Sequence, residues 1–128
     1  VVCDIFSPCA LGGTINGEPI PRMSCLMVAG GANNQLAEDS DGDELHRRGI
    51  LYAPDYIINA GGIINVSAEI GSEYNLDRAR EKTEHIYETI SRVMQISKDE
   101  EIPAAQGANR LVKQRLDSVR SIKSMYRP

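Results

Sequence analysis

Several features that define other classes of protein are scarce in this sequence of 128 residues. No apolar run approaches the ~18 to 20 residues that a membrane-spanning helix needs. The two histidines, His46 and His85, lie far apart with no histidine or cysteine at ligand spacing, which argues against a zinc site. The acidic run Glu38–Glu44 does not fit a calcium loop, because its glycine comes too early. We therefore predict no metal site and no membrane partner.

The three cysteines, Cys3, Cys9 and Cys25, are odd in number and have no C-x-x-C spacing. This usage favours reduced thiols, and therefore a cytoplasmic protein, over a disulfide framework. The sequence has no initiator methionine and opens at Val1 directly on an apolar run that resembles a strand. We expect from this that the chain is cut from something larger.

Charge is unevenly distributed along the chain, whose formal net charge is −4. Residues 103–128 carry a net charge of +5, so residues 1–102 carry −9. A basic helical tail can bind RNA or a membrane surface, but no row of aromatic residues accompanies these charges to stack on bases. We interpret the tail as a solvated helix face beside an acidic neighbour and expect no nucleic-acid partner, with RNA binding kept as a weaker alternative.

The first half contains three apolar runs that each end in small residues: Val1–Phe6, Cys25–Ala29 and Ile50–Ile58. Continuous apolar runs are typical of parallel strands that are buried on both faces. A helix-length stretch from about Asn33 to Arg48, closed by Gly49, separates the second run from the third. The pattern predicts an α/β fold with about three short parallel strands.

The second half changes to a period of three and four residues, which marks amphipathic helices. One helix follows Asn75 or Asp77, either of which could cap it, and a break at Asp99–Pro103 separates it from a last helix. We predict two parts, residues 1–74 with the strands and residues 75–128 with a C-terminal helical hairpin that packs on them.

Glycine-rich clusters follow all three predicted strands, at the edge of an open α/β sheet where ligands bind. Asn33 and Asn34 lie after the second strand and Asn59 after the third, where side-chain amides suit a neutral polar ligand such as a carboxamide or a ribose. The alternative is that these asparagines only cap helices. No complete G-x-G-x-x-G occurs, so the chain lacks a pyrophosphate cradle of its own.

Four segments together resemble the glutamate/leucine/phenylalanine/valine dehydrogenase family: Cys3–Gly13, Val28–Leu36, Gly49–Tyr56 and Asn59–Gly62. The resemblance is collinear, extends over nearly the whole chain and is most specific in its first 75 residues. It implies the later part of a Rossmann-like NAD-binding domain followed by C-terminal helices. It also implies NAD-dependent oxidative deamination of an L-amino acid to a 2-oxo acid and ammonia, and a homo-oligomer.

The resemblance assigns cofactor roles to five residues. Pro8, Cys9 and Ala10 should line the cofactor crevice near the nicotinamide ribose. Asn33 should lie where the substrate carboxylate and that ribose meet, and Asn59 should bind the nicotinamide carboxamide.

The same resemblance assigns a substrate pocket to Gly62, Ile63 and Val66, beside Asn33. Relatives that are specific for glutamate carry a serine where Val66 stands. Valine cannot form that hydrogen bond to the distal carboxylate, which would be costly to bury unpaired. We therefore expect a branched aliphatic substrate such as leucine in preference to glutamate, with a phenylalanine or valine dehydrogenase as alternatives.

The catalytic residues of the family belong to an earlier domain, and none of them is expected in this chain. Lysines occur only at Lys82, Lys98, Lys113 and Lys123, in the predicted helices, where they are solvated. A catalytic lysine needs a desolvated cleft that lowers its pKa. We expect the chain alone to be inactive and to need a missing N-terminal catalytic domain as its partner. A non-catalytic nucleotide-binding or regulatory module of the same fold is the alternative.

Overall fold

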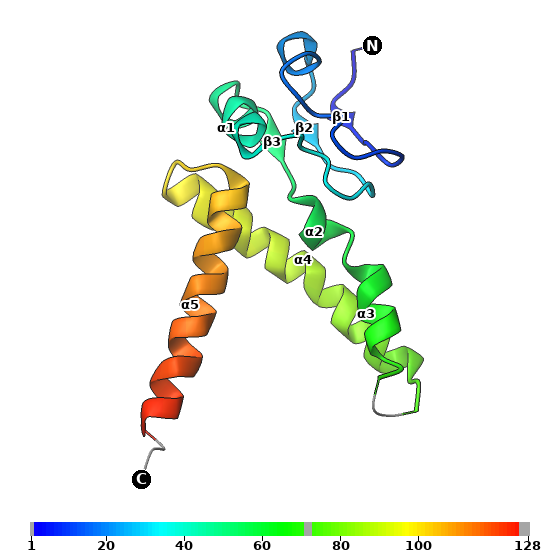
Figure 1. Cartoon of the computed structure of the whole chain (residues 1–128), viewed down its shortest axis with the longest axis vertical. Coiled ribbons are helices and arrows are strands. Elements are labelled where there is room, and N and C mark those ends of the chain that lie inside the picture. The colour runs from blue at the N-terminus through cyan, green and yellow to red at the C-terminus, as the bar shows by residue number, and fades with distance from the viewer. Residues whose placement is uncertain (1, 71–72, 126–128) are drawn as a thin grey trace.

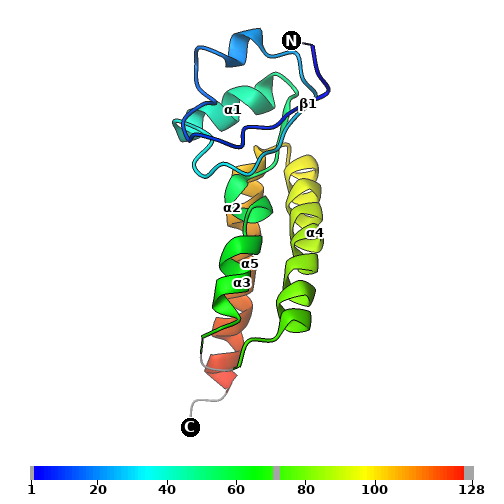
Figure 2. The same cartoon turned by 90° about the vertical axis from the view of Figure 1, so that its right-hand side faces the viewer.

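The computed structural model describes residues 2–70 and 73–125, which form a small α/β head at one end and long helices that extend from it (Figures 1 and 2). In chain order the elements are β1 (Ile5–Phe6), the 3-10 helix η1 (Ile20–Arg22), β2 (Met27–Val28), α1 (Asp39–Arg47), β3 (Leu51–Tyr52), α2 (Asp55–Ile58), α3 (Gly61–Ser67), α4 (Leu76–Asp99) and α5 (Ala104–Met125).

The three strands form one parallel sheet in the order β1-β2-β3. Met27 of β2 lies in register with Ile5 on one side and Leu51 on the other. Helix α1 connects β2 to β3, which confirms the predicted strand–helix–strand unit. The prediction of three short parallel strands is also confirmed.

The predicted third strand was too long. β3 ends at Tyr52, and Pro54 then precedes helix α2 at the position where the run Ile50–Ile58 was expected to remain extended. The helix starts because the Asp55 carboxylate accepts the N–H of Tyr56 at 2.8 Å, which satisfies a donor of the first turn. The apolar residues Ile57 and Ile58 therefore belong to a short helix.

The predicted helix after the second strand also begins later than expected. Residues 33–38 form a loop, and α1 starts only at Asp39, because Glu38 and Asp41 exchange side-chain and backbone hydrogen bonds as a capping box. Its end agrees with the prediction, since Gly49 follows the helix with φ +72°, in the left-handed region.

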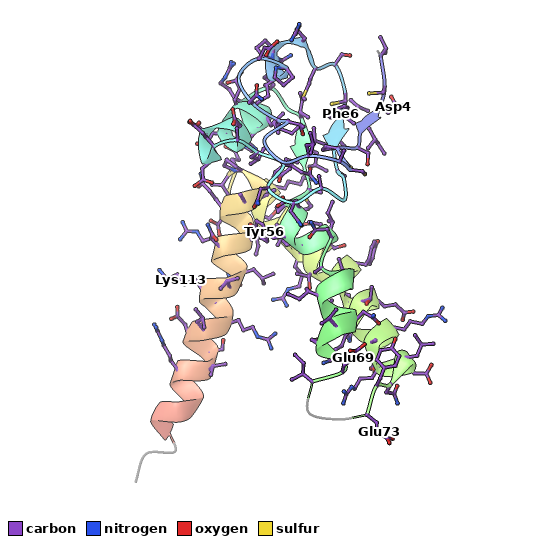
Figure 3. All side chains as sticks on the ribbon, turned by 45° about the vertical axis from the view of Figure 1, so that its right-hand side comes forward. Asp4, Phe6, Tyr56, Glu69, Glu73 and Lys113 are labelled. Carbon is purple, nitrogen blue, oxygen red and sulfur yellow. The ribbon has the colours of Figure 1, made fainter. Side chains whose placement is uncertain are left out.

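The core of the head covers only one face of the sheet. It consists of Ile15, Ile20, Cys25, Val28, Leu45, Ile50 and Tyr52. The side chain of Ile5 is 57% exposed, and Phe6 and Leu51 are exposed too, with Phe6 at the outer edge of the head beside Asp4 (Figure 3). The expectation that the strands are buried on both faces was therefore wrong for the described residues. No helix or strand in the described part of the chain covers the outer side of β1.

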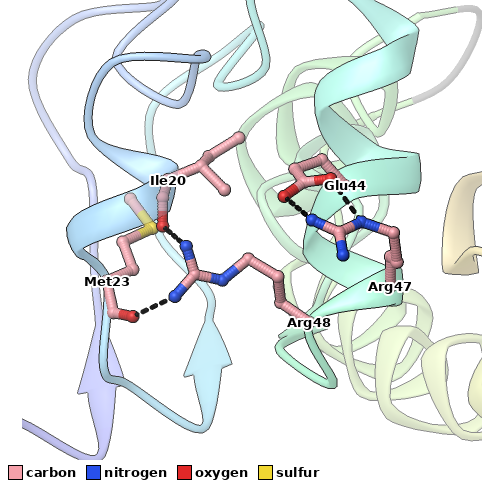
Figure 4. A network of polar contacts seen from close by, with 5 residues as sticks. All are labelled: Ile20, Met23, Glu44, Arg47 and Arg48. Atoms are coloured by element: carbon pink, nitrogen blue, oxygen red, sulfur yellow. Dashed lines mark hydrogen bonds and ion pairs between the residues drawn. The ribbon is translucent and has the colours of Figure 1, made fainter.

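A long connection between β1 and β2 contains the short helix η1, and its Ile15 forms an isolated parallel bridge with Leu36. Arg48, at the end of α1, holds this connection through its guanidinium, which donates to the carbonyl oxygens of Ile20 and of Met23, the latter at 3.0 Å (Figure 4). The neighbouring Arg47 instead binds the exposed Glu44 on its own helix.

Helices α2 and α3 run down from the head along α4 (Figure 1). Helix α5 starts at the end of α4 that lies next to the head and extends in another direction. The side chain of Asn75 accepts the N–H of Arg78 at 2.9 Å, which confirms it as one of the two predicted caps of α4.

A second core joins Val93 of α4 to Ala104 and Ala108 of α5. At Gly107 a side-chain carbon would lie 2.9 Å from the carbonyl oxygen of Val93. No helix in the described part of the chain is long and apolar enough to cross a membrane.

Candidate functional site

The loops that follow β1 and β2 pack directly on each other. The N–H of Ala32 donates to the carbonyl oxygen of Pro8 at 3.0 Å, and the N–H of Gly13 donates to that of Asn34 at 2.7 Å. Gly30 makes this approach possible, because a Cβ there would lie 2.1 Å from the Pro8 carbonyl oxygen. The predicted convergence of the first two glycine clusters therefore takes place through backbone contacts.

Asn59 joins the third cluster to the second. Its Nδ2 donates to Oδ1 of Asn33 at 2.6 Å and lies 3.5 Å from the carbonyl oxygen of Ala32. The sequence suggested that Asn59 ends a strand, but in the structure it follows α2 as its C-terminal cap. The contact leaves Oδ1 of Asn59 and Nδ2 of Asn33 without a partner among the described residues, so the pair retains one acceptor and one donor.

The segment Pro8–Ala10 packs against residues 30–32 of the loop that carries Asn33. Pro8 is buried beneath the β2 loop, whereas Cys9 and Ala10 are exposed. The backbone N–H of Gly31 donates to Sγ of Cys9 at 3.4 Å, and Oγ of Ser7 lies 3.4 Å from the same sulfur. These two hydrogen bonds, that of Gly31 first, lower the pKa of the Cys9 thiol.

The residues expected to wall a substrate pocket follow Asn59 on the next helix. Gly62, Ile63 and Val66 belong to α3, which extends along α4 away from the sheet (Figure 1). Ile63 is 73% exposed and Val66 59% exposed, and a Cβ at Gly62 would meet nothing within 4 Å. Within the described residues these side chains form an apolar surface, not a closed pocket.

Sequence reasoning missed a buried polar network beneath the converging loops. The side-chain amide of Gln35 donates to the carbonyl oxygens of Gly30 and Ala32, at 2.6 and 3.0 Å. The backbone N–H of Gln35 donates to Oδ2 of Asp55 at 3.0 Å. Gln35 and Asp55 both lie in the segments that carried the family resemblance, but apolar periodicity gives no signal for a buried glutamine.

Burial raises the pKa of Tyr52, next to this network, to about 12, and the charge of Asp55 contributes to the same shift. In the described part of the chain no group of three or more His, Cys, Asp or Glu side chains is arranged to hold a metal ion. The polar groups of the converging loops are side-chain amides, backbone groups, the Ser7 hydroxyl and the Cys9 thiol, with the Asp55 carboxylate beneath them.

The sequence profile described as Glutamate/Leucine/Phenylalanine/Valine dehydrogenase matches residues 1–121. The chain belongs to this family. A leucine dehydrogenase of Bacillus cereus is 50% identical over 126 residues, which make up 98% of this chain and 34% of that protein. A phenylalanine dehydrogenase of Thermoactinomyces intermedius is 44% identical over 121 residues, or 94% of this chain and 33% of that one. The chain thus spans about a third of the length of these relatives.

Solved structures agree with the family assignment. The crystal structure of L-tryptophan dehydrogenase from Nostoc punctiforme matches 90% of this chain and 35% of its own, with a TM-score of 0.84 and 43% identity. Glutamate dehydrogenase from Peptoniphilus asaccharolyticus matches 94% of this chain and 32% of its own with a TM-score of 0.72, and at 20% identity it supports the fold alone. The predicted Rossmann-like α/β fold is confirmed.

Proposed function

We propose that this chain is the nicotinamide-binding part of a longer, cytoplasmic NAD-dependent amino-acid dehydrogenase. In this proposal residues 1–74 are the later part of the NAD-binding domain, and residues 75–128 are the helices that support it. The observation that carries the proposal is the hydrogen bond between Asn33 and Asn59 at the meeting point of the loops. The family supports the reaction class, which is reversible oxidative deamination of an L-amino acid to a 2-oxo acid and ammonia.

The residues present fit the nicotinamide end of NAD. A primary carboxamide has both a donor and an acceptor, which match the remaining Oδ1 of Asn59 and Nδ2 of Asn33. Cys9 and Ala10 would border the adjoining ribose. When bound, NAD⁺ supplies a hydride acceptor. The part of this chain is to bind the nicotinamide and to orient it through paired amides that are fixed before the ligand arrives.

The general acid and base must come from outside these residues. Lys82, Lys98 and Lys113 are exposed on α4 and α5, and Lys113 lies on the part of α5 below the head (Figure 3). A catalytic lysine needs a desolvated cleft, and these three side chains are in contact with solvent. We therefore expect this chain alone to be inactive, and we expect the catalytic lysines in the other two-thirds of a protein of the relatives' length.

The apolar surface of α3 supports a branched aliphatic substrate. Ile63 and Val66 offer methyl groups and no hydrogen-bond donor at their tips, so a buried distal carboxylate would lose its hydration without replacement. The leucine, phenylalanine and valine dehydrogenases among the relatives leave the preference within the apolar amino acids open to experiment. A closed pocket would require the part of the protein that lies outside this chain.

The full-length protein tests this proposal directly. We expect NADH formation with leucine to exceed that with phenylalanine and to be absent with glutamate. We expect Asn59→Asp to raise the Kd for NAD⁺ about tenfold, the cost of about one good hydrogen bond. Asn109→Asp, at an exposed position of α5, serves as the matched control and should leave the Kd unchanged. An Asn59→Asp variant that binds NAD⁺ normally removes the proposed role, and absence of turnover with all amino acids favours a non-catalytic module.

A further inference from the structure

Gln35 occupies an unusual position for a polar residue. Its side chain is fully buried, and both of its amide hydrogens are directed at backbone carbonyls of its own loop, those of Gly30 and Ala32. Its Oε1 has no hydrogen-bond partner in the described structure. A buried acceptor without a partner destabilises the folded state, so this glutamine is a poor choice for stability alone.

Asp55 connects the same loop to helix α2. The residue is 6% exposed. Its Oδ2 accepts the backbone N–H of Gln35 at 3.0 Å, and its Oδ1 accepts the N–H of Tyr56 in the first turn of the helix. One carboxylate therefore fixes both the end of the loop that carries Asn33 and the start of the helix that ends at Asn59.

These contacts form a closed ring. The ring leads from Asn33 along the loop to Gln35, across to Asp55, through α2 to Asn59, and back by the 2.6 Å contact between the two asparagines. Asn34, between Asn33 and Gln35, has φ +51°, a left-handed conformation that non-glycine residues rarely adopt. Such a conformation persists where neighbouring contacts impose it, as those of Gln35 and Gly13 do on either side.

We propose that Gln35 and Asp55 are positioning residues that set the orientation of Asn33 toward Asn59 and thereby the affinity for the nicotinamide group. This inference rests on the proposed function for its ligand, while the geometry it describes exists in the free protein. Neither residue touches the ligand. Their effect on binding passes through the amide pair.

The first experiment changes Asp55→Asn in the full-length protein. Asparagine keeps the shape but has one oxygen for two N–H donors, so either the Gln35 or the Tyr56 bond is lost. We expect the Kd for NAD⁺ to rise about tenfold. Without ligand, we also expect faster hydrogen exchange of a peptide over residues 30–36, measured by mass spectrometry. Asp117→Asn, on the exposed surface of α5, is the control and should change neither quantity.

A double-mutant cycle then separates positioning from general destabilisation. If Asp55 acts through the amide pair, adding Asp55→Asn to Asn59→Ala should weaken NAD⁺ binding no more than about twofold beyond Asn59→Ala alone. Independent effects would multiply to about a hundredfold, and that result would overturn the proposal. Gln35→Met, which preserves length but removes both donors, repeats the cycle if Asp55→Asn does not fold.

The two proposals fail in different ways. If the unaltered full-length protein does not bind NAD⁺, the proposed function is wrong, and hydrogen exchange alone then decides the positioning role. Faster exchange over residues 30–36 in Asp55→Asn or Gln35→Met, with unchanged exchange in the Asp117→Asn control, supports that role. Unchanged exchange in the Asp55 and Gln35 variants overturns it.

Discussion

The α-carbon of Gly30 lies against the backbone of Pro8 so closely that a Cβ would be 2.6 Å from the proline nitrogen and 2.1 Å from its carbonyl oxygen. These atoms belong to buried main chain and cannot turn aside as the end of a long side chain can. The contact joins the loop after β1 to the loop after β2, and through it the segment of Cys9 is held beside that of Asn33.

We predict that Gly30→Ala destabilises the protein by at least about 1–3 kcal/mol, because the two loops must separate to admit the methyl group. Gly17→Ala is the matched control, since a Cβ at Gly17 would meet nothing within 4 Å. Its effect should stay within about 0.5 kcal/mol. Urea unfolding of the two variants measures the difference, and equal midpoints would contradict the contact.

Arg48→Lys should destabilise the head by about 1–2 kcal/mol, because an ammonium group cannot span both carbonyl oxygens that the guanidinium binds. The control is Arg47→Lys one residue earlier, whose solvent-accessible pair with Glu44 should contribute far less. Thermal unfolding at neutral pH compares the two. A larger loss for Arg47→Lys would mean that Arg48 does not hold the connection between β1 and β2.

Ionisation of the Tyr52 hydroxyl should lower the free energy of unfolding in alkaline solution. Its pKa of about 12 lies above the ordinary tyrosine value of about 10. The unfolded chain therefore loses this proton first as pH rises. The contribution of protonated Tyr52 to the free energy of unfolding is complete below pH ~10 and disappears between pH ~10 and ~12. Tyr52→Phe should show a shallower decline of melting temperature over this interval than the unaltered protein. Tyr87→Phe, at an exposed site, should follow the unaltered curve.

The Cys9 thiol should react with iodoacetamide at lower pH than an ordinary cysteine, because hydrogen bonds from Gly31 and Ser7 stabilise its thiolate. Ser7→Ala removes one of them and should move the alkylation midpoint of the Cys9 peptide to higher pH. Ser118→Ala, on α5, should not move it. Mass spectrometry of the Cys9 peptide across a pH series gives the midpoints, and identical profiles would exclude the serine contact.

The sequence predicted the elements that depend on local patterning. Apolar runs that end in glycine located the three strands, and the periodicity after Asn75 located the two long helices. It could not show where β3 ends, because Ile57 and Ile58 suit a buried strand as well as a buried helix. In the structure α2 begins there after Pro54, and the Asp55 carboxylate accepts the N–H of Tyr56 in its first turn.

The candidate site was predicted in composition but only partly in geometry. Asn33 and Asn59 were expected near each other and are in contact, whereas Ile63 and Val66 lie exposed on α3. Burial depends on which surfaces meet, and residue patterns along one chain do not show that. Gln35 was missed for a related reason, since its two partners are backbone carbonyls that no side-chain pattern reveals.

The tight approach of Gly107 to Val93 gives α5 a fulcrum near its first turns. Beyond it, Val112, Leu116 and Val119 remain exposed, so the contacts that direct the helix gather in its first turns. From Gly107 to Met125 the helix extends about 27 Å. A tilt of about 10° at Gly107 therefore moves the far end of the helix by about 5 Å.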